Sequence, residues 1–368
     1  MLTTYHLRVL DVSVALCGPQ DVLTPVVRAY GRFLVQGPPP EGTHEIRLES
    51  ARADSFRDGS NTVPVIGGAN LTLQIYERFL NAVFDRVAAY AVLHAGALLD
   101  ARGEALLIAG PSGFGKTSLT LELLCRGLKF LSDDYAPVDL STGKVRPYPR
   151  TVGLLPDGSA RTPQRFVDAA ANPSHARLLG KALIDVGEVL GEAVIATNAA
   201  PPGHVVFLDT GDGEGAYRSV VHMGVWPRGV REAETLIEEI PGVVALGRTD
   251  RDDITVWRVE LDHDRLPTKR FSDLLERDFV AFSETRPSAG PDFRSEPRLT
   301  PLKRREVAIL LCREVQNRRP RGRLMQAYGG DTTGLFLDVA AALASARCYR
   351  LQVGNFESTA NLLQELTR

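Results

Sequence analysis

Residues 93–134 read LHAGALLDARGEALLIAGPSGFGKTSLTLELLCRGLKFLSDD. Within them, residues 110–117 (GPSGFGKT) match the pattern GxxxxGK[ST] in full, which is the signature of a phosphate-binding loop. The match lies between an apolar run and a Leu-rich segment, so it connects a predicted strand to a predicted helix. That context favours a phosphate loop over an ordinary Gly-rich turn. The chain also holds 37 Arg but 6 Lys, so a Lys falls at the required position by chance only rarely.

The loop residues indicate which groups would hold a nucleoside triphosphate. Backbone amides of a glycine-rich turn and of the following helix N-terminus surround phosphate groups. Lys116 would reach the β and γ phosphates, and the hydroxyl of Thr117 would bind Mg²⁺. We therefore expect ATP and Mg²⁺ as cofactors. The predicted nucleotide-binding residues are Gly110, Ser112, Gly113, Phe114, Gly115, Lys116, Thr117 and Ser118.

Two adjacent aspartates, Asp133 and Asp134, end the strand predicted after the loop helix. Adjacent strand residues point to opposite faces, so we expect them to have different roles. One carboxylate would hold Mg²⁺ and the other would accept the proton of an attacking hydroxyl. Aspartates at strand ends also cap turns, but this reading is less favoured behind a phosphate loop. We assign Asp133 as the base and Asp134, with Thr117, as a metal ligand, and the residues alone leave the reverse assignment open.

Together these segments resemble the catalytic core of the HPr kinase/phosphorylase family, and more closely the HPr-kinase-related proteins associated with modified-peptide biosynthesis. The likeness covers the strand that carries His94, the hairpin before the loop, the loop itself, the helix ending in RG and the LSDD strand. It continues through YPRTVGL at 148–154 and, more weakly, CYRLQVG at 348–354. The resemblance implies the mixed-sheet fold of phosphoenolpyruvate-carboxykinase-like kinases. It also adds His94 to Lys116 and Asp133 as a catalytic residue, although a lone strand His is more often a core residue.

The chain also departs from the family pattern. Bifunctional HPr kinases follow the loop with Ser-Glu, whereas Ser118 follows Thr117 here. The later family signature, a run similar to RGLGIINV, is not found in the sequence. The resemblance therefore does not carry over HPr as the substrate or the reverse phosphorolysis.

Outward from this core, the sequence predicts a mixed α/β fold with four parts. Residues 1–68 carry alternating runs typical of a small antiparallel β-rich domain. Residues 69–282 would form the kinase core, which opens with an amphipathic helix over 70–91 and includes strands near 204–209, 242–246 and 254–261 and helices near 235–239 and 271–282. Residues 283–300, rich in Pro, Ser and charge, predict a linker or exposed loop. Residues 301–368 would complete the core.

Composition excludes several classes of protein. The formal net charge is −2, so no global field attracts nucleic acid or an anionic membrane surface. The four Cys residues lie far apart without the spacing of a zinc site or a disulfide framework. Neither a signal peptide nor a run of apolar residues long enough to span a membrane is evident. We expect a cytoplasmic protein with no membrane partner, and the resemblance favours a homo-oligomer.

Several other residues have weaker signals. Arg150 could contact a phosphate, but in so Arg-rich a chain a surface position is favoured. The cluster of Arg318, Arg319, Arg321 and Arg323 could dock an acidic group, although a solvated loop is favoured. Trp226 and Trp257 are expected in the core.

The function that these signals favour is an ATP-dependent kinase that phosphorylates a Ser or Thr hydroxyl of a peptide or small protein. Two alternatives stay open. The acceptor could be a small-molecule alcohol such as free serine, or the loop could sense ATP in a non-catalytic regulatory protein.

Overall fold

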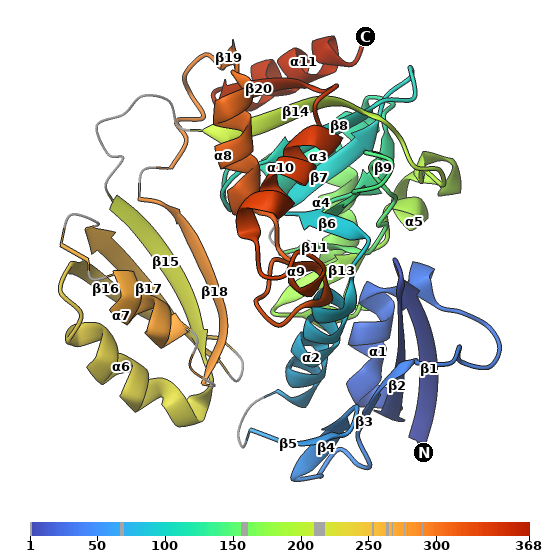
Figure 1. Ribbon diagram of the computed structural model, residues 1–368, viewed down its shortest axis with the longest axis vertical. Helices are drawn as coiled ribbons and strands as arrows, with labels where there is room; N and C mark the ends of the chain where they lie inside the picture. The colour runs from blue at the N-terminus through green and yellow to red at the C-terminus, as the bar shows by residue number, and fades with distance from the viewer. Residues whose placement is uncertain are drawn as a thin grey trace.

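The structure is a computed structural model that describes residues 2–66, 70–155, 161–209, 218–251, 254–262, 265–266, 268–275, 277, 279–288 and 290–368. Figure 1 shows a central layered body, with an N-terminal unit below it and a further β-sheet to its left. The mixed α/β fold predicted from the sequence is confirmed. In the part of the chain that the structure describes, no helix is both long and apolar enough to cross a membrane.

The central body is built on a six-stranded mixed sheet with the order β19-β20-β14-β8-β7-β9. β8 runs parallel to β14, and β14 runs parallel to β20, while β7 pairs antiparallel with both β8 and β9. The hairpin predicted before the loop is therefore confirmed as β7 and β8. The bounds are β7 (Ala95–Leu99), β8 (Ala105–Ala109), β9 (Lys129–Ser132), β14 (Pro202–Asp209), β19 (Arg298–Pro301) and β20 (Arg347–Gln352).

Helices cover both faces of this sheet, which explains why β8 is apolar at every position. Leu106 and Ile108 of β8 pack in one cluster with α3 (Lys116–Cys125) and α11 (Phe356–Leu366). Leu107 and Ala109 point the other way, into a cluster with α8 (Arg304–Glu314) and α10 (Thr332–Ala342). The C-terminal segment thus supplies two strands and the helices α8, α10 and α11, among others, to the layers around the loop.

Shorter elements surround the central sheet. β6 (Tyr90–Leu93) pairs antiparallel with β10 (Ala136–Asp139). A three-stranded sheet has the order β11-β13-β12. Its strands and the neighbouring helices are β11 (Val152–Leu154), β12 (Arg177–Leu178), β13 (Lys181–Ile184), α4 (Gln164–Ala171), α5 (Val186–Leu190), η2 (Glu192–Val194) and α9 (Arg323–Ala327).

The N-terminal unit contains a five-stranded sheet in sequential order, antiparallel except for the parallel pair β2 and β3. Two helices share its core, α1 and the long helix α2 (Leu71–Arg86). α1 was not predicted, and α2 ends at Arg86, well before residue 91, because Tyr90–Leu93 pairs as a strand instead. The remaining bounds are β1 (Leu2–Val9), β2 (Val12–Pro19), α1 (Gln20–Ala29), η1 (Gly31–Phe33), β3 (His44–Arg47), β4 (Ser55–Asp58) and β5 (Asn61–Pro64).

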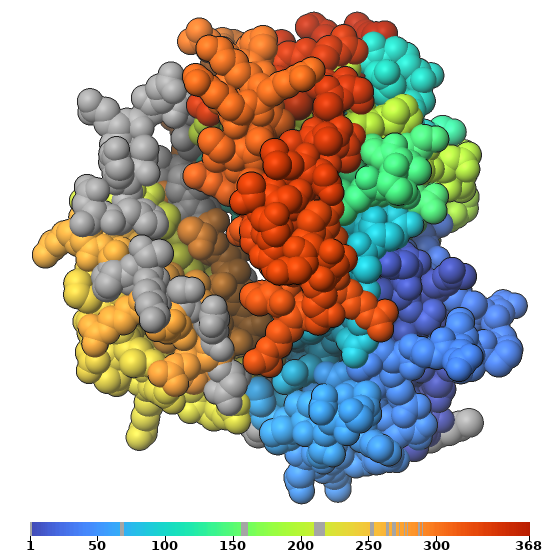
Figure 2. Space-filling model, viewed as in Figure 1, coloured from blue at the N-terminus to red at the C-terminus, as the bar shows by residue number. Residues whose placement is uncertain are grey.

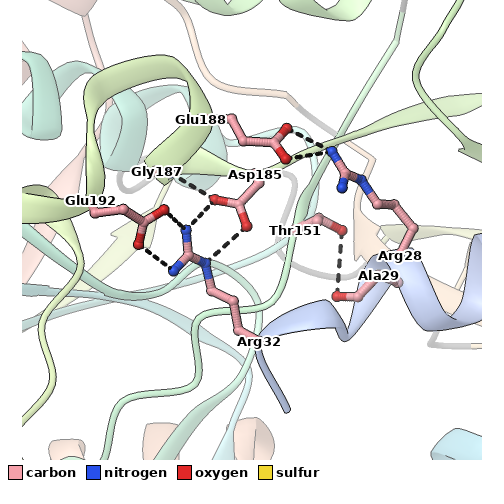
Figure 3. Close-up of polar contacts among 8 residues, drawn as sticks. All are labelled: Arg28, Ala29, Arg32, Thr151, Asp185, Gly187, Glu188 and Glu192. Carbon is pink, nitrogen blue, oxygen red and sulfur yellow. Dashed lines mark hydrogen bonds and ion pairs between the residues drawn. The ribbon is translucent and has the colours of Figure 1, made fainter. Parts of the chain in front are cut away.

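Ion pairs fasten the N-terminal unit to the central body (Figure 3). Arg32 pairs with Asp185 at 2.6 Å and with Glu192 at 2.7 Å. Asp185 also caps α5 by accepting from the backbone N–H two residues on. Arg28 pairs with Glu188 at 2.6 Å, but both of these side chains are exposed. The pair of Arg32 with Asp185 is more sheltered, and such pairs contribute more than exposed ones.

A four-stranded antiparallel sheet lies between β14 and β19 in the chain, with the order β16-β17-β15-β18. α6 and α7 cover one of its faces, in a core of its own that includes Trp257. Trp226, next to β15, packs in the N-terminal core, so both Trp residues are buried as predicted. The bounds are β15 (Arg218–Val225), η3 (Pro227–Gly229), α6 (Val230–Glu238), β16 (Val243–Arg251), β17 (Ile254–Asp262), α7 (Thr268–Leu275) and β18 (Val280–Pro287).

This sheet corrects two sequence predictions. The helix predicted over 271–282 ends at Leu275, and residues 280–282 begin β18, because their backbone pairs with β15. The loop predicted over 283–300 is a strand as far as Pro287, and β19 begins at Arg298.

Candidate active site

The loop at 110–115 follows β8 and leads into α3 with the backbone conformations of a phosphate loop. Gly110, Gly113 and Gly115 have φ values of 143°, 82° and 91°, which favour glycine. A Cβ added at Gly110 would come within 2.8 Å of the Leu208 Cβ on β14. α3 has no side-chain N-cap, so the amides of its first turn are available to an anion. Phe114 is buried in the apolar cluster that also contains Leu106 and Ile108, so its side chain anchors the loop.

Lys116 is the first residue of α3, and its side chain folds back over the loop. Its Nζ donates to the Gly110 carbonyl at 2.5 Å, and the residue is 7% exposed. Burial lowers the pKa of Lys116, while the carboxylates of Asp134, Glu314, Asp133 and Glu284 act in the opposite direction. An ammonium group has three donors, so the bond to Gly110 leaves donors for phosphate oxygens.

Asp133 lies beside the loop, directly after β9. Its Oδ2 accepts a hydrogen bond from the Thr117 hydroxyl at 3.1 Å. Its Oδ1 is buried and has no hydrogen-bond partner among the described residues. Burial, reinforced by the charge of Asp134, raises the pKa of Asp133 to about 7. This carboxyl group can therefore both hold and release a proton near neutral pH.

Asp134, like Asp133, lies beyond the end of β9 at Ser132, and its carboxylate has a different partner from that of Asp133. Arg150 donates to its Oδ2, and the same guanidinium donates to the Tyr76 hydroxyl at 2.9 Å. The guanidinium also lies 4.9 Å from the centre of the Tyr135 ring. Burial acts to raise the pKa of Asp134, but the Arg150 guanidinium holds it below its ordinary value. The surface position favoured for Arg150 from the sequence is wrong, because only 11% of its side chain is exposed.

His94 lies between β6 and β7, close to both Lys116 and Asp134. Its backbone N–H donates to the Glu314 carbonyl at 2.7 Å. Burial, with the charge of Lys116, lowers the pKa of His94 to about 4, against the opposing effect of Asp134. The imidazole is therefore neutral at physiological pH. The structure brings His94, Lys116, Thr117 and the two aspartates together at one end of the central sheet.

Two acidic residues near Lys116 were missed by sequence reasoning. Glu314 ends α8, and burial raises the pKa of its carboxyl to about 7. Glu284 lies on β18, and its charge acts on Lys116 as well. Both come from parts of the chain far from the loop, and no local motif marks them. Of the Arg cluster noted in the sequence, Arg319 pairs with Asn81 and Asp85 on α2 and also lines the large cavity described below.

A cavity of about 1220 Å³ opens in front of the aspartates. Its walls come from α2, from the Asp pair with Thr117, and from the four-stranded sheet. Figure 2 shows the surface hollowed beside the C-terminal helices, along the boundary with this sheet. A smaller pocket of about 250 Å³ adjoins the loop at Ser112 and Gly113. Arg258 of β17 lines both spaces, so the phosphate loop and the large cavity are neighbours.

The donor atoms around Thr117 suit a magnesium ion. Mg²⁺ prefers oxygen ligands and is commonly held by one or two carboxylates together with substrate phosphates. The buried, unpartnered Oδ1 of Asp133 lies beside the Thr117 hydroxyl, and Asp134 is the next residue. No group of three or more His, Cys, Asp or Glu ligands occurs among the described residues.

A glycine-rich loop between a buried strand and a helix, with a Lys at the helix start and aspartates directly after β9, is the arrangement typical of a phosphate-loop α/β protein. Known proteins specify the relationship further. An HPr kinase/phosphorylase of Nitrosomonas europaea is 41% identical over 73 residues, 20% of this chain and 22% of the relative. An HPr kinase/phosphorylase of Clostridium botulinum is 31% identical over 114 residues, which are 30% of this chain and 35% of the relative. An HPr kinase/phosphorylase of Bacillus subtilis is 38% identical over 74 residues, which are 20% of this chain and 24% of the relative. The chain is related to HPr kinase/phosphorylases.

This relationship is partial. The matched segments span about a quarter to a third of the length of these curated relatives, and no family model matches the chain. The solved structure of the Hpr(Ser) kinase/phosphatase from Coxiella burnetii aligns with 46% of this chain and 83% of its own, at 17% identity and a TM-score of 0.23. The sequence relatives, rather than this superposition, carry the relationship.

Proposed function

We propose that the protein is an ATP-dependent kinase that transfers the γ-phosphoryl group to a Ser or Thr hydroxyl of a peptide or small protein. One observation carries the proposal. Beside a phosphate loop, Asp133 keeps a buried, unpartnered carboxylate oxygen at the mouth of a large cavity, with a pKa of about 7. A general base works best when its pKa lies near the working pH.

The loop and its neighbours would hold the nucleotide. The amides of the loop and of the first turn of α3 would surround the phosphates, and Lys116 would exchange its bond to Gly110 for phosphate oxygens. Thr117 and Asp134 would hold Mg²⁺, which would neutralise charge on the β and γ phosphates. Ser112 and Gly113 border the small pocket beside the loop, which is open to part of the nucleotide.

The proposed transfer is a direct in-line displacement. The acceptor hydroxyl gives its proton to Asp133 as its oxygen forms a bond to the γ phosphorus. The bond from that phosphorus to the bridging oxygen breaks, and ADP leaves. Lys116 stabilises the charge that develops on the phosphoryl oxygens. Neutral His94, close to Asp134, helps to position the pair without adding positive charge.

One contact favours the reverse assignment of the two aspartates. Thr117, the other proposed metal ligand, donates to Asp133, whereas Asp134 is engaged by Arg150. An aspartate next to the loop hydroxyl is well placed on the metal side of such a site. The pKa values favour the first assignment, because Asp134, held below its ordinary pKa, is the weaker base.

The size of the cavity supports a peptide acceptor over a small molecule. Small-molecule sites enclose about 300–1,000 Å³, and this cavity of about 1220 Å³ is larger. A protein that merely senses ATP would have no need of the unpartnered oxygen of Asp133 beside the loop.

The test combines calorimetry with phosphate transfer. The protein is incubated with γ-labelled ATP, Mg²⁺ and peptides containing Ser or Thr, and label is sought on the hydroxyls by mass spectrometry. Lys116→Ala should weaken ATP binding at least tenfold, and unchanged binding would refute the role of the loop. Asp133→Asn should keep ATP binding and lose transfer, whereas loss of transfer in Asp134→Asn alone would favour the reverse assignment. Label that appears on free serine but on no peptide would favour a small-molecule kinase.

A further inference from the structure

β18 has a free edge in the described part of the chain, where it pairs with β15 alone. The Ser288 N–H donates to the Arg218 carbonyl, which fixes the hydrogen-bonding alternation of this antiparallel pair. In an antiparallel pair, every second residue directs its N–H and C=O groups to the partner strand. Starting from Ser288, the backbone groups of residues 286, 284 and 282 therefore face β15. Those of Ser283 and Thr285 therefore face outward, away from the sheet. The outward N–H and C=O groups of these two residues could pair with the backbone of an additional strand.

The large cavity lies along this edge. Side chains of a strand alternate between its two faces, so a cavity over one face is lined by every second residue. The lining contributed by β17 follows that rule, with Ile254, Val256 and Arg258. On β18, by contrast, five consecutive residues line the cavity: Val280, Ala281, Phe282, Ser283 and Glu284. A cavity that contacts consecutive residues borders the edge of the strand.

Both edges of the sheet carry some protection against pairing with other chains. β16, at the other edge, has a register shift between Val243 and Ala245 and carries Arg248 and Asp250. β18 has a register shift at Ala281, because Phe282 pairs with Gly224 and Val280 pairs with Val225, and it carries Glu284. Bulges and charged side chains are the usual means by which edge strands avoid pairing with other chains. From Phe282 to Glu284, however, β18 keeps a regular register with β15, and this stretch lines the cavity that also contains Asp133.

We propose that the acceptor binds as an extended peptide segment that adds to the free edge of β18 as a fifth strand, with its hydroxyl side chain directed to Asp133. This inference rests on the proposed kinase function and specifies its substrate as an extended segment. Backbone bonds to Ser283 and Thr285 would supply affinity, as in other cases of strand addition. The cavity that borders this edge also contains Asp133, Asp134 and Thr117, so a bound strand and the reacting groups share one space.

A proline scan of the two edges tests the inference. The best substrate is first selected from peptides with a fixed central Ser and randomised flanks, and is then synthesised. Ser283→Pro removes an outward N–H without removing a bond to β15, a replacement that edge strands tolerate. The matched control, Leu246→Pro, sits at an outward position on β16 under the same alternation. We expect Ser283→Pro to raise the KM for the peptide about tenfold with little change in the KM for ATP, and Leu246→Pro to change neither.

A second measurement separates strand addition from side-chain contact. Hydrogen exchange at the amides of Ser283 and Thr285 should slow when the peptide binds, and N-methylation of alternate peptide amides should abolish that protection. Unchanged KM in Ser283→Pro together with unchanged exchange would overturn the edge site and leave the kinase function standing. Failure of every peptide to accept label, while calorimetry still shows ATP binding, would overturn the kinase function and this inference with it.

Discussion

The pairing of Arg150 with Asp134 leads to a quantitative prediction about stability. Arg150→Met keeps most of the volume of the side chain but removes the guanidinium that contacts Asp134, Tyr76 and Tyr135. Asp134 would then lie in a sheltered position without its cation. We expect a loss of stability at neutral pH that becomes smaller in acid.

The magnitude follows from how far the pair is buried. Removing one partner of a fully buried pair destabilises a protein by about 3–5 kcal/mol. The side chain of Arg150 is 11% exposed and that of Asp134 is 31% exposed, so water can screen part of the unpaired charge. We therefore expect a loss of about 2 kcal/mol. In the wild type the lowered pKa of Asp134 gives stability that is present above its unfolded pKa and is lost as pH falls. In the variant, the Asp134 carboxyl can take up a proton in the folded state. The difference in the free energy of unfolding between the wild type and the variant therefore becomes smaller toward a pH of about 4.

Urea unfolding followed by circular dichroism at neutral and at acid pH measures this difference. The double variant Arg150→Met, Asp134→Asn should recover most of the lost stability, because no unpaired charge remains. Arg28→Met, which removes an exposed pair, should change stability by less than about 0.5 kcal/mol at either pH. Equal losses at both pH values in Arg150→Met would refute the electrostatic explanation and leave packing as the cause.

Three further predictions concern the loop, the cavity and the N-terminal unit. Gly110→Ala should lower ATP affinity at least tenfold by calorimetry with circular dichroism unchanged, because a Cβ there would come within 2.8 Å of β14. Burial raises the pKa of Glu77 in the folded protein to about 8. The folded state therefore holds this proton more tightly than the unfolded chain, and the free energy of unfolding falls as pH rises from the pKa of an unfolded Glu toward 8. Glu77→Gln should match the wild type near pH 4 in thermal unfolding and exceed it near pH 9, on the order of 2 kcal/mol. Arg32→Ala should lower the free energy of unfolding by about 1–2 kcal/mol, measured in urea, because Asp185 loses a sheltered partner.

The loop region could be predicted from the sequence because its determinants are contiguous. The motif places glycines where positive φ is required and Lys116 at the helix start, and the following strand delivers both aspartates to the same edge. None of this depends on distant pairing. The hairpin before the loop could be predicted for the same reason, since its two apolar runs are joined by a short turn.

The predictions that were wrong or missing concern residues whose structure is decided by tertiary contacts. Arg150 is one of 37 arginines, and nothing in its local sequence distinguishes a buried guanidinium from a solvated one. Residues 280–282 have a spacing that also fits a helix, and pairing with β15 decides the outcome. Glu314 reaches the loop because residues 314–317 pair beside β6, where Asn317 accepts from the Val92 N–H at 3.0 Å.

The parallel pairing of β14 with β20 has a consequence for how the protein is made. β14 ends at Asp209 and β20 begins at Arg347, with the four-stranded sheet between them in the chain. Contacts of such long sequence separation form slowly, because the intervening loop must first be closed. On the ribosome, the sheet that supports the phosphate loop cannot close until Gln352 has left the exit tunnel. The N-terminal unit and the four-stranded sheet would thus fold first, and nascent chains would acquire a nucleotide site only after these two parts.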